Sequence, residues 1–329
     1  MFTRRTLFKA GLGAGVMMTG AGSFARHVFA AEDVTYLLPA PAFLPAFAPW
    51  ILAQKRGYYA NEGLNVTFQS ARGGVDVAKQ VGAGNAVIGG AIGDTPIIVR
   101  ANGIPVKSVA VLGGRSLMQL VSHKSSGIEG PQDLKGKTVT TLSYADTTYY
   151  ALLGMMAKVG LTKDDVNIQA AGPAGVWKLF ISGEADAMAA VPDWIGIAMG
   201  AGKEVNIIPA DNYFKSMAQA ILASDDTIKN SPELIGKLVR ATLKGMNDIM
   251  TDPAAASVDY VAAVPQHEGK EKAMEAVFNL YNTYVYPGQE TLGMMDSERL
   301  AGLQDFYVEQ GIVRNATALD DLYTNQFVS

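Results

Sequence analysis

The chain has 329 residues, of which 49% are hydrophobic and 18% charged, and its 27 basic and 31 acidic residues give a net charge of −4. This composition is typical of a folded globular protein and excludes a disordered one. The chain has no cysteine and three histidines. Disulfides, thiolate metal sites and a histidine-rich metal centre are therefore excluded, and we expect no cofactor and no metal.

The first 30 residues resemble a twin-arginine (Tat) export signal. Thr3-Arg4-Arg5-Thr6-Leu7-Phe8-Lys9 places two arginines before an apolar pair and a lysine, and small residues at Ala30 and Ala31 fit a cleavage site. The glycine-rich apolar run between them, residues 10–25, is shorter than the roughly 20 residues of a membrane span and a poor surface helix. We therefore expect a signal peptide over residues 1–30 and a periplasmic mature protein.

The expected mature chain is acidic. Removal of residues 1–30 takes four basic and no acidic residues, which leaves a net charge of −8. Such a chain has no long-range attraction to nucleic acid or to an anionic membrane, so neither is expected as a partner. The adjacent acids at 164–165, 225–226 and 320–321 lack the alternating spacing of a calcium loop.

The remaining sequence predicts strands that alternate with helices. The first block has expected strands at 34–38, 64–68, 86–91, 107–112 and 117–123, and helices at 49–56, 75–83 and 95–101. The second block has expected strands at 138–141, 166–169, 185–189 and 205–209, and helices at 144–159 and 175–181. After residues 218–222 the chain turns helical, at 232–250, 253–264, 270–283 and 297–310. This order predicts an α/β fold with right-handed βαβ units, mainly parallel sheets and a helical C-terminal third.

Four segments resemble, in order, elements of one protein family. They are GYYANEGLNV at 57–66, DLKGK at 133–137, SGEADA at 182–187 and NSPEL at 230–234. The chain is similar to substrate-binding proteins of ABC importers for nitrate, sulfonate, taurine and pyrimidine precursors.

The resemblance implies a two-lobed periplasmic binding protein fold of type II, with ligand held between lobes that two hinge crossovers join. The crossovers would lie near Ser122–Ser126 and Asp211–Lys215. Lobe 1 would comprise 31–122 and 216–329, with the helical C-terminal part packed on it, and lobe 2 would comprise 123–215. The implied partners are a small organic ligand and a membrane permease with its cytoplasmic ATPase. We expect a monomer.

Lobe 1 offers seven candidate ligand-binding residues. Phe43 and Phe47 stand on a proline-stiffened loop and form either an apolar wall or plain core. Gly73 and Gly74 either present backbone N–H groups to a ligand or make a turn. The other three are Arg72, a candidate for an anion or a solvated surface residue; Asp94, a candidate helix cap; and Thr95, a possible ligand hydroxyl.

Lobe 2 offers four more candidates. Ser143 and Thr147 stand near the start of the long predicted helix, where hydroxyls bind an anionic group or cap the helix. Asp193 and Trp194 follow the SGEADA segment, where the resembling family often has a polar residue and an aromatic. The alternative for this pair is a helix cap beside a core tryptophan.

An exported enzyme and a subunit of a membrane sensor are the two alternative functional classes. An exported hydrolase would need a nucleophile, but the chain has no Gly-x-Ser-x-Gly motif and no cysteine, and a triad would have to use His123 or His267. Some pyrimidine-synthesising enzymes share the implied fold but use an iron site with cysteine and histidine. A ligand-binding subunit of a membrane sensor would use the same lobes as an importer subunit. We therefore expect a binding protein and not an enzyme.

The candidate loops also predict the ligand type. Nitrate would need a site rich in basic side chains, and here Arg72 and Arg115 are the main ones. Aromatic residues with the acid Asp193 instead favour an organic ligand with a flat or apolar body and a hydrogen-bond donor or amine. A pyrimidine-like or aromatic compound or an amino-sulfonate fits this description better than an inorganic anion. Other sulfonates also remain among the expected ligand classes.

Overall fold

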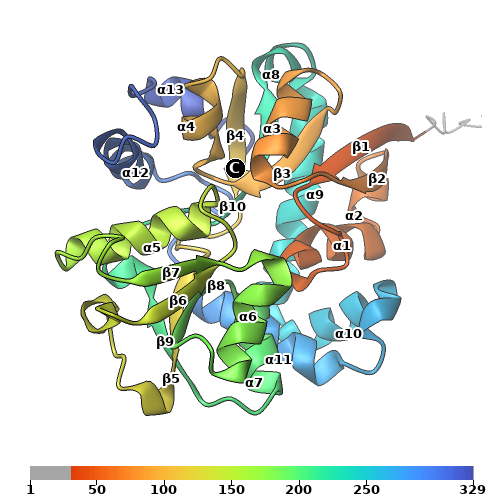
Figure 1. The fold of residues 1–329 in the computed structure, drawn as a ribbon. Coiled ribbons are helices and arrows are strands. Elements are labelled where there is room, and N and C mark those ends of the chain that lie inside the picture. The colour runs from red at the N-terminus through yellow and green to blue at the C-terminus, as the bar shows by residue number, and fades with distance from the viewer. Residues whose placement is uncertain (1–30, 329) are drawn as a thin grey trace, which may run out of the picture. The chain divides into compact units, whose positions relative to one another are not determined.

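The computed structural model describes residues 31–328, and the expected signal peptide lies outside them. These residues form two halves, each built on one five-stranded sheet (Figure 1). The strands of the first sheet are β1 (Glu32–Leu38), β2 (Leu64–Ser70), β3 (Ile88–Ile92), β4 (Val106–Val111) and β10 (Gln219–Ser224). Those of the second are β5 (Gln119–His123), β6 (Thr138–Thr141), β7 (Asn167–Ala170), β8 (Ala187–Ala190) and β9 (Val205–Pro209).

Helices cover both sheets, and the last third of the chain is almost entirely helical. Those of the first half before the crossing are α1 (Ala48–Lys55), α2 (Tyr58–Asn61), α3 (Gly74–Gly82) and α4 (Thr95–Arg100), with a short 3-10 helix η1 (Pro45–Phe47) before α1. The second half contains α5 (Thr147–Lys158), α6 (Gly172–Ser182) and α7 (Pro192–Gly200). The C-terminal helices are α8 (Asp225–Asn230), α9 (Pro232–Thr251), α10 (Pro253–Ala263), α11 (Glu271–Tyr284), α12 (Ser297–Glu309) and α13 (Leu319–Leu322).

Both sheets are mixed, which corrects the predicted mainly parallel arrangement. The strand order is β2-β1-β3-β10-β4 in the first sheet and β7-β6-β8-β5-β9 in the second. In the first sheet β10 runs antiparallel to β3 and β4, and in the second β5 runs antiparallel to β8 and β9. Each reversed strand is the one by which the chain enters from the other half. It starts at the edge where the other strands end, and so it must run in the opposite direction.

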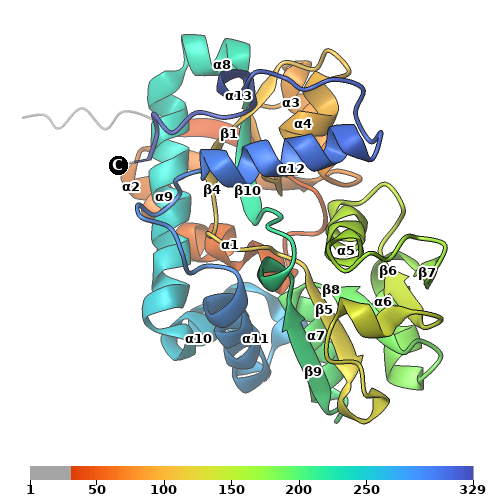
Figure 2. The same cartoon turned by 90° about the vertical axis from the view of Figure 1, so that its left-hand side faces the viewer.

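The first crossing lies earlier than the sequence predicted. The strand β5 pairs in the second sheet, so the chain has left the first half before Gln119 and not near 122–126. The second crossing lies between the end of β9 at Pro209 and the start of β10 at Gln219. Figure 2 shows the two crossing segments running side by side between the halves.

The C-terminal helices contact both halves. The long helix α9 packs along α1, whereas α11 packs against α7 of the second half (Figure 2). The α7–α11 contact is close because Gly196 has no side chain: a Cβ there would lie 2.5 Å from Cγ2 of Val277. The largest buried side chains of the first half include Trp50 and Tyr36, whose rings meet edge to face.

Candidate functional site

A small cavity lies between the two halves. It is too narrow to hold a water molecule and is lined by Ile92, Asp94, Leu117, Met118, Thr147, Thr148, Ser216 and Met217. Ile92 ends β3 and Asp94 precedes α4 in the first half, whereas the two threonines begin α5 in the second half. The other four residues belong to the crossing segments. Ligand pockets typically enclose about 300–1,000 Å³. A ligand of ordinary size therefore requires the halves to move apart before it enters.

Asp94 is the acidic group of this cavity. Its side chain is fully buried, and the hydroxyl of Tyr307 donates a hydrogen bond to Oδ2 at 2.5 Å. The other oxygen, Oδ1, has no hydrogen-bond partner. Burial raises the pKa of Asp94 to about 7, with a further rise from the charge of Asp146, against the lowering effect of the Tyr307 hydrogen bond. Although Asp94 precedes α4, its carboxylate does not cap that helix.

The opposite wall is the start of α5. Asp146 caps this helix, because its Oδ1 accepts hydrogen bonds from the backbone N–H of Thr148 at 2.9 Å and from the Thr148 hydroxyl. Capping therefore uses Asp146 and leaves the neighbouring Thr147 hydroxyl free. Oγ1 of Thr147 is buried and has no hydrogen-bond partner. The cavity thus has one unpaired polar oxygen on each wall.

Asp193 connects the halves at a second place. Its Oδ2 accepts a hydrogen bond from the backbone N–H of Ala46 at 3.0 Å, and its Oδ1 accepts one from the hydroxyl of Tyr281 at 2.9 Å. Burial raises the pKa of Asp193 to about 6, although both hydrogen bonds lower it. The side chain does not cap α7. Both oxygens of Asp193 therefore bind protein groups of the first half and its C-terminal helices.

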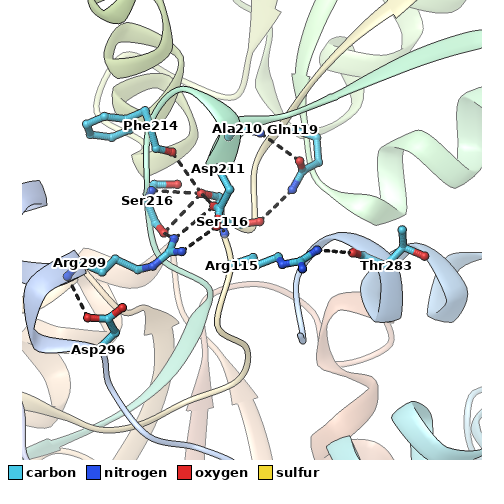
Figure 3. Close-up of polar contacts among 10 residues, drawn as sticks. All are labelled: Arg115, Ser116, Gln119, Ala210, Asp211, Phe214, Ser216, Thr283, Asp296 and Arg299. Atoms are coloured by element: carbon cyan, nitrogen blue, oxygen red, sulfur yellow. Dashed lines mark hydrogen bonds and ion pairs between the residues drawn. The ribbon is translucent and has the colours of Figure 1, made fainter. Parts of the chain in front are cut away.

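Asp211 joins the two crossing segments to each other and to α12 (Figure 3). Asp211 of the second crossing accepts hydrogen bonds from the backbone N–H and the hydroxyl of Ser116 in the first crossing. Its Oδ2 also lies 2.6 Å from Nη2 of Arg299 on α12, a side chain that is only 8% exposed. Burial alone would raise the pKa of Asp211, but the bonds to Arg299 and Ser116 lower it below the usual range.

The first crossing is also enclosed by the C-terminal part of the chain. A Cβ on Gly113 would lie 2.5 Å from the carbonyl oxygen of Val285, and one on Gly114 would lie 2.6 Å from the carbonyl carbon of Gly288. Nη1 of Arg115 donates to the carbonyl of Thr283 at 3.0 Å (Figure 3). Glycine is thus needed at both positions for this close backbone approach.

The two aromatic candidates of the first half differ in their exposure to solvent. Phe47 is buried in the core beside Trp50, so the core alternative holds and its ring lines no crevice. Phe43 is 39% exposed, while its carbonyl accepts hydrogen bonds from Tyr260 and His267. The loop is thus fixed to the C-terminal helices, and the ring of Phe43 stays accessible.

Near α3 and α4, Arg72 is exposed to solvent, whereas Gly73, Gly74 and Thr95 serve the packing of the first half. The Arg72 side chain is 93% exposed. The N–H of Gly73 donates to the carbonyl of Pro39, and a Cβ on Gly74 would lie 3.0 Å from Ala91 and 3.4 Å from Oγ1 of the buried Thr95. The glycines therefore make a turn and a close packing contact, and their proposed role in presenting N–H groups to a ligand has no support here.

The remaining candidates of the second half lie near the interface between the halves. Ser143 is half-buried in the loop before α5. Trp194 is half-buried and packs within the apolar cluster of the second half, which Leu280 of α11 also contacts. Of the eleven candidates, only Asp94 and Thr147 line the cavity. Sequence reasoning missed the crossing residues Leu117, Met118, Ser216 and Met217, because their position depends on where the chain leaves each sheet.

Two kinds of feature are absent from residues 31–328. No group of three or more His, Cys, Asp or Glu side chains is placed to hold a metal ion in this part of the chain. None of its helices is both long and apolar enough to cross a membrane.

Comparisons with known proteins agree with the two-lobed fold. The sequence pattern that defines the NMT1/THI5-like family matches residues 44–256. The chain belongs to the NMT1/THI5-like family. It is 26% identical over 296 residues to the riboflavin-binding protein RibY of Chloroflexus aurantiacus, an alignment that covers 86% of this chain and 82% of RibY.

Two further relatives show the range of this family and fold. A 4-amino-5-hydroxymethyl-2-methylpyrimidine phosphate synthase of Aspergillus parasiticus is 27% identical over 236 residues, covering 67% of this chain and 68% of the synthase. The periplasmic aliphatic sulphonate-binding protein SsuA of Escherichia coli superposes with a TM-score of 0.70 at 16% identity, covering 88% of this chain and 96% of SsuA. The fold is therefore that of two-lobed periplasmic binding proteins, and the relatives of this chain include both a binding protein and an enzyme.

Proposed function

We propose that this chain is the periplasmic ligand-binding subunit of an ABC importer, which captures a small organic ligand between its two halves. The observation that carries the proposal is the cavity between the halves, where Asp94 and Thr147 present one unpaired buried oxygen each. A buried polar group without a partner costs about 1–3 kcal/mol, so a ligand that pairs with these oxygens recovers stability as the halves close.

The comparisons support this proposal. RibY and SsuA are both named as binding proteins, and SsuA is described as periplasmic. The residues that connect the halves also fit a hinged binder. Asp211 joins the two crossing segments through Ser116 and holds them to α12 through Arg299, and closure around a ligand gives a membrane partner two states to distinguish. The Tat-type signal at residues 1–30 would carry the chain to the periplasm.

Ligand binding without turnover is the test. Six compounds serve as probes in thermal unfolding: riboflavin, 4-amino-5-hydroxymethyl-2-methylpyrimidine, taurine, ethanesulfonate, butanesulfonate and nitrate. We expect at least one to raise the unfolding temperature, because a ligand at a hundredfold excess over its Kd stabilises the folded state by about 2.7 kcal/mol. If none does so, binding of these ligand classes is refuted.

An enzyme is the second candidate, because the pyrimidine phosphate synthase relatives belong to the same family. Mass spectrometry of the best ligand after prolonged incubation with the protein separates the two functions. Recovery of the intact compound supports a binding subunit, whereas conversion to a new compound moves the chain to the enzyme class. Loss of uptake of that ligand when the chain is deleted, with the permease intact, supports importer over sensor.

A further inference from the structure

The two buried aspartates between the halves differ in one respect. Asp94 and Asp193 each accept a hydrogen bond from a buried tyrosine, Tyr307 in one case and Tyr281 in the other. The second oxygen of Asp193 accepts a hydrogen bond from the backbone of Ala46, whereas Oδ1 of Asp94, a residue that lines the cavity, has no partner. Asp193 is therefore satisfied by the protein itself, and Asp94 is one hydrogen bond short.

The surroundings hold the Asp94 carboxylate in place. Tyr307, which binds its Oδ2, also contacts the ring of Tyr150 on α5, with ring centroids 5.4 Å apart. A side chain from each half thus fixes the position of the tyrosine that orients Asp94. Across the cavity, Oγ1 of Thr147 is the other unpaired group, and a hydroxyl both donates and accepts.

The charge of the cavity is acidic. None of its eight lining residues is basic, and the carboxylate of Asp146 lies close enough to Asp94 to raise its pKa. The basic side chain that contacts a lining residue is Arg299, which donates to the carbonyl of Ser216 and is paired with Asp211. Above about pH 7, where Asp94 is ionised, a bare oxyanion brought beside it would meet like charge with no free cation among the lining residues.

We propose that Asp94 and Thr147 are the specificity-determining pair of the site and that they bind a donor group, an amine, amidine or ring N–H, on a neutral or cationic part of the ligand. The inference rests on the proposed ligand-binding function. It moves the acidic partner of the ligand from Asp193 to Asp94, and it excludes nitrate and simple alkanesulfonates as the natural ligand. The apolar lining residues Ile92, Leu117, Met118 and Met217 fit the apolar body of such a ligand.

Calorimetric titration of the full mature chain tests the proposal with two arms of probes. The donor arm is riboflavin, 4-amino-5-hydroxymethyl-2-methylpyrimidine and taurine, and the anion arm is ethanesulfonate, butanesulfonate and nitrate. Taurine and ethanesulfonate are a matched pair that differ by the amine. We expect the tightest binder in the donor arm, and we expect ethanesulfonate to bind at least tenfold more weakly than taurine if taurine binds.

Three variants locate the contact. Asp94→Asn keeps an acceptor for Tyr307 but turns the free oxygen into a donor, so the best donor-arm compound should bind at least tenfold more weakly and the anions no more weakly than to wild type. Thr147→Val should weaken the same compound about fivefold or more. Tyr36→Phe is the matched control, because its hydroxyl is also buried and unpaired but does not line the cavity. Its affinity should equal that of wild type. Urea unfolding checks that each variant folds.

The outcomes separate the inference from the proposed function. Donor-arm binding that Asp94→Asn weakens and Tyr36→Phe leaves unchanged supports both. Binding of anions alone, or a donor-arm affinity that Asp94→Asn does not change, overturns the inference and leaves the binding function standing. If no compound of either arm binds, the proposed function for these ligand classes fails, and the inference fails with it.

Discussion

The buried carboxyl of Asp94 predicts an unusual pH dependence of folding stability. Burial raises the pKa of Asp94 from 3.8 to about 7 in the folded protein. Between about pH 4 and pH 7 the folded protein holds this proton while the unfolded chain has released it, so the free energy of unfolding falls as the pH rises. At about 1.4 kcal/mol for each pH unit, the loss across this window is about 4 kcal/mol.

The variant Asp94→Asn removes this loss, because its amide is neutral at every pH and still accepts the Tyr307 hydrogen bond. Urea unfolding without ligand at pH 4.5, 6 and 8 measures the effect. We expect wild type and variant to differ little at pH 4.5. As the pH rises, wild type should lose stability and the variant should not, so that at pH 8 the variant is more stable than wild type by about 4 kcal/mol.

A control of opposite sign is available in Asp76→Asn. The backbone N–H of Arg72 lowers the pKa of Asp76, so its carboxylate stabilises the fold above about pH 4 and the variant should lose stability there. If wild type and Asp94→Asn give parallel pH profiles, the carboxyl is not held in its neutral form by burial, and the reasoning from its environment is refuted.

Three other predictions concern the hinge, the packing of the halves and export. Arg299→Met leaves the partly buried carboxylate of Asp211 without its partner and should lower the free energy of unfolding by about 3 kcal/mol in urea; a loss below about 1 kcal/mol would show that the ion pair does not hold α12 to the second crossing. Gly196→Ala should cost about 1–3 kcal/mol by forcing α7 away from α11, whereas Gly200→Ala on the same helix meets no atom within 4 Å and should not destabilise the protein. Replacing Arg4 and Arg5 by lysine should leave precursor in the cytoplasm on fractionation, and normal export would refute the Tat interpretation.

The secondary structure could be predicted because its signals are local. The predicted helix at residues 232–250 matches α9 over Pro232–Thr251, which begins with a proline. The predicted strand at 138–141 coincides with β6. The direction of β5 and β10 could not be predicted, because it depends on which half the preceding residues belong to and not on the residues of the strand.

Only part of the candidate site could be predicted, because local sequence does not determine which polar groups meet between the halves. Asp94 and Thr147, two of the predicted ligand-binding residues near helix starts, line the cavity. From sequence, however, Asp193 had the same pattern as Asp94. What separates them is whether a backbone N–H from a distant loop reaches the second oxygen, as that of Ala46 reaches Asp193 from 147 residues away. Such a contact cannot be predicted from the residues next to Asp193 in the sequence.

The enclosure of the first crossing by the C-terminal segment has a consequence for how the chain is made. Arg115 binds a carbonyl that lies 168 residues later, and Gly113 and Gly114 pack against residues 285–288. Residues 283–288 leave the ribosome only after the strands of both sheets have been synthesised, so the junction between the halves assembles late. A chain that stops before residue 285 should therefore form its two sheets but leave them without a fixed relative position, and the complete chain should fold slowly because its decisive contacts span such long loops.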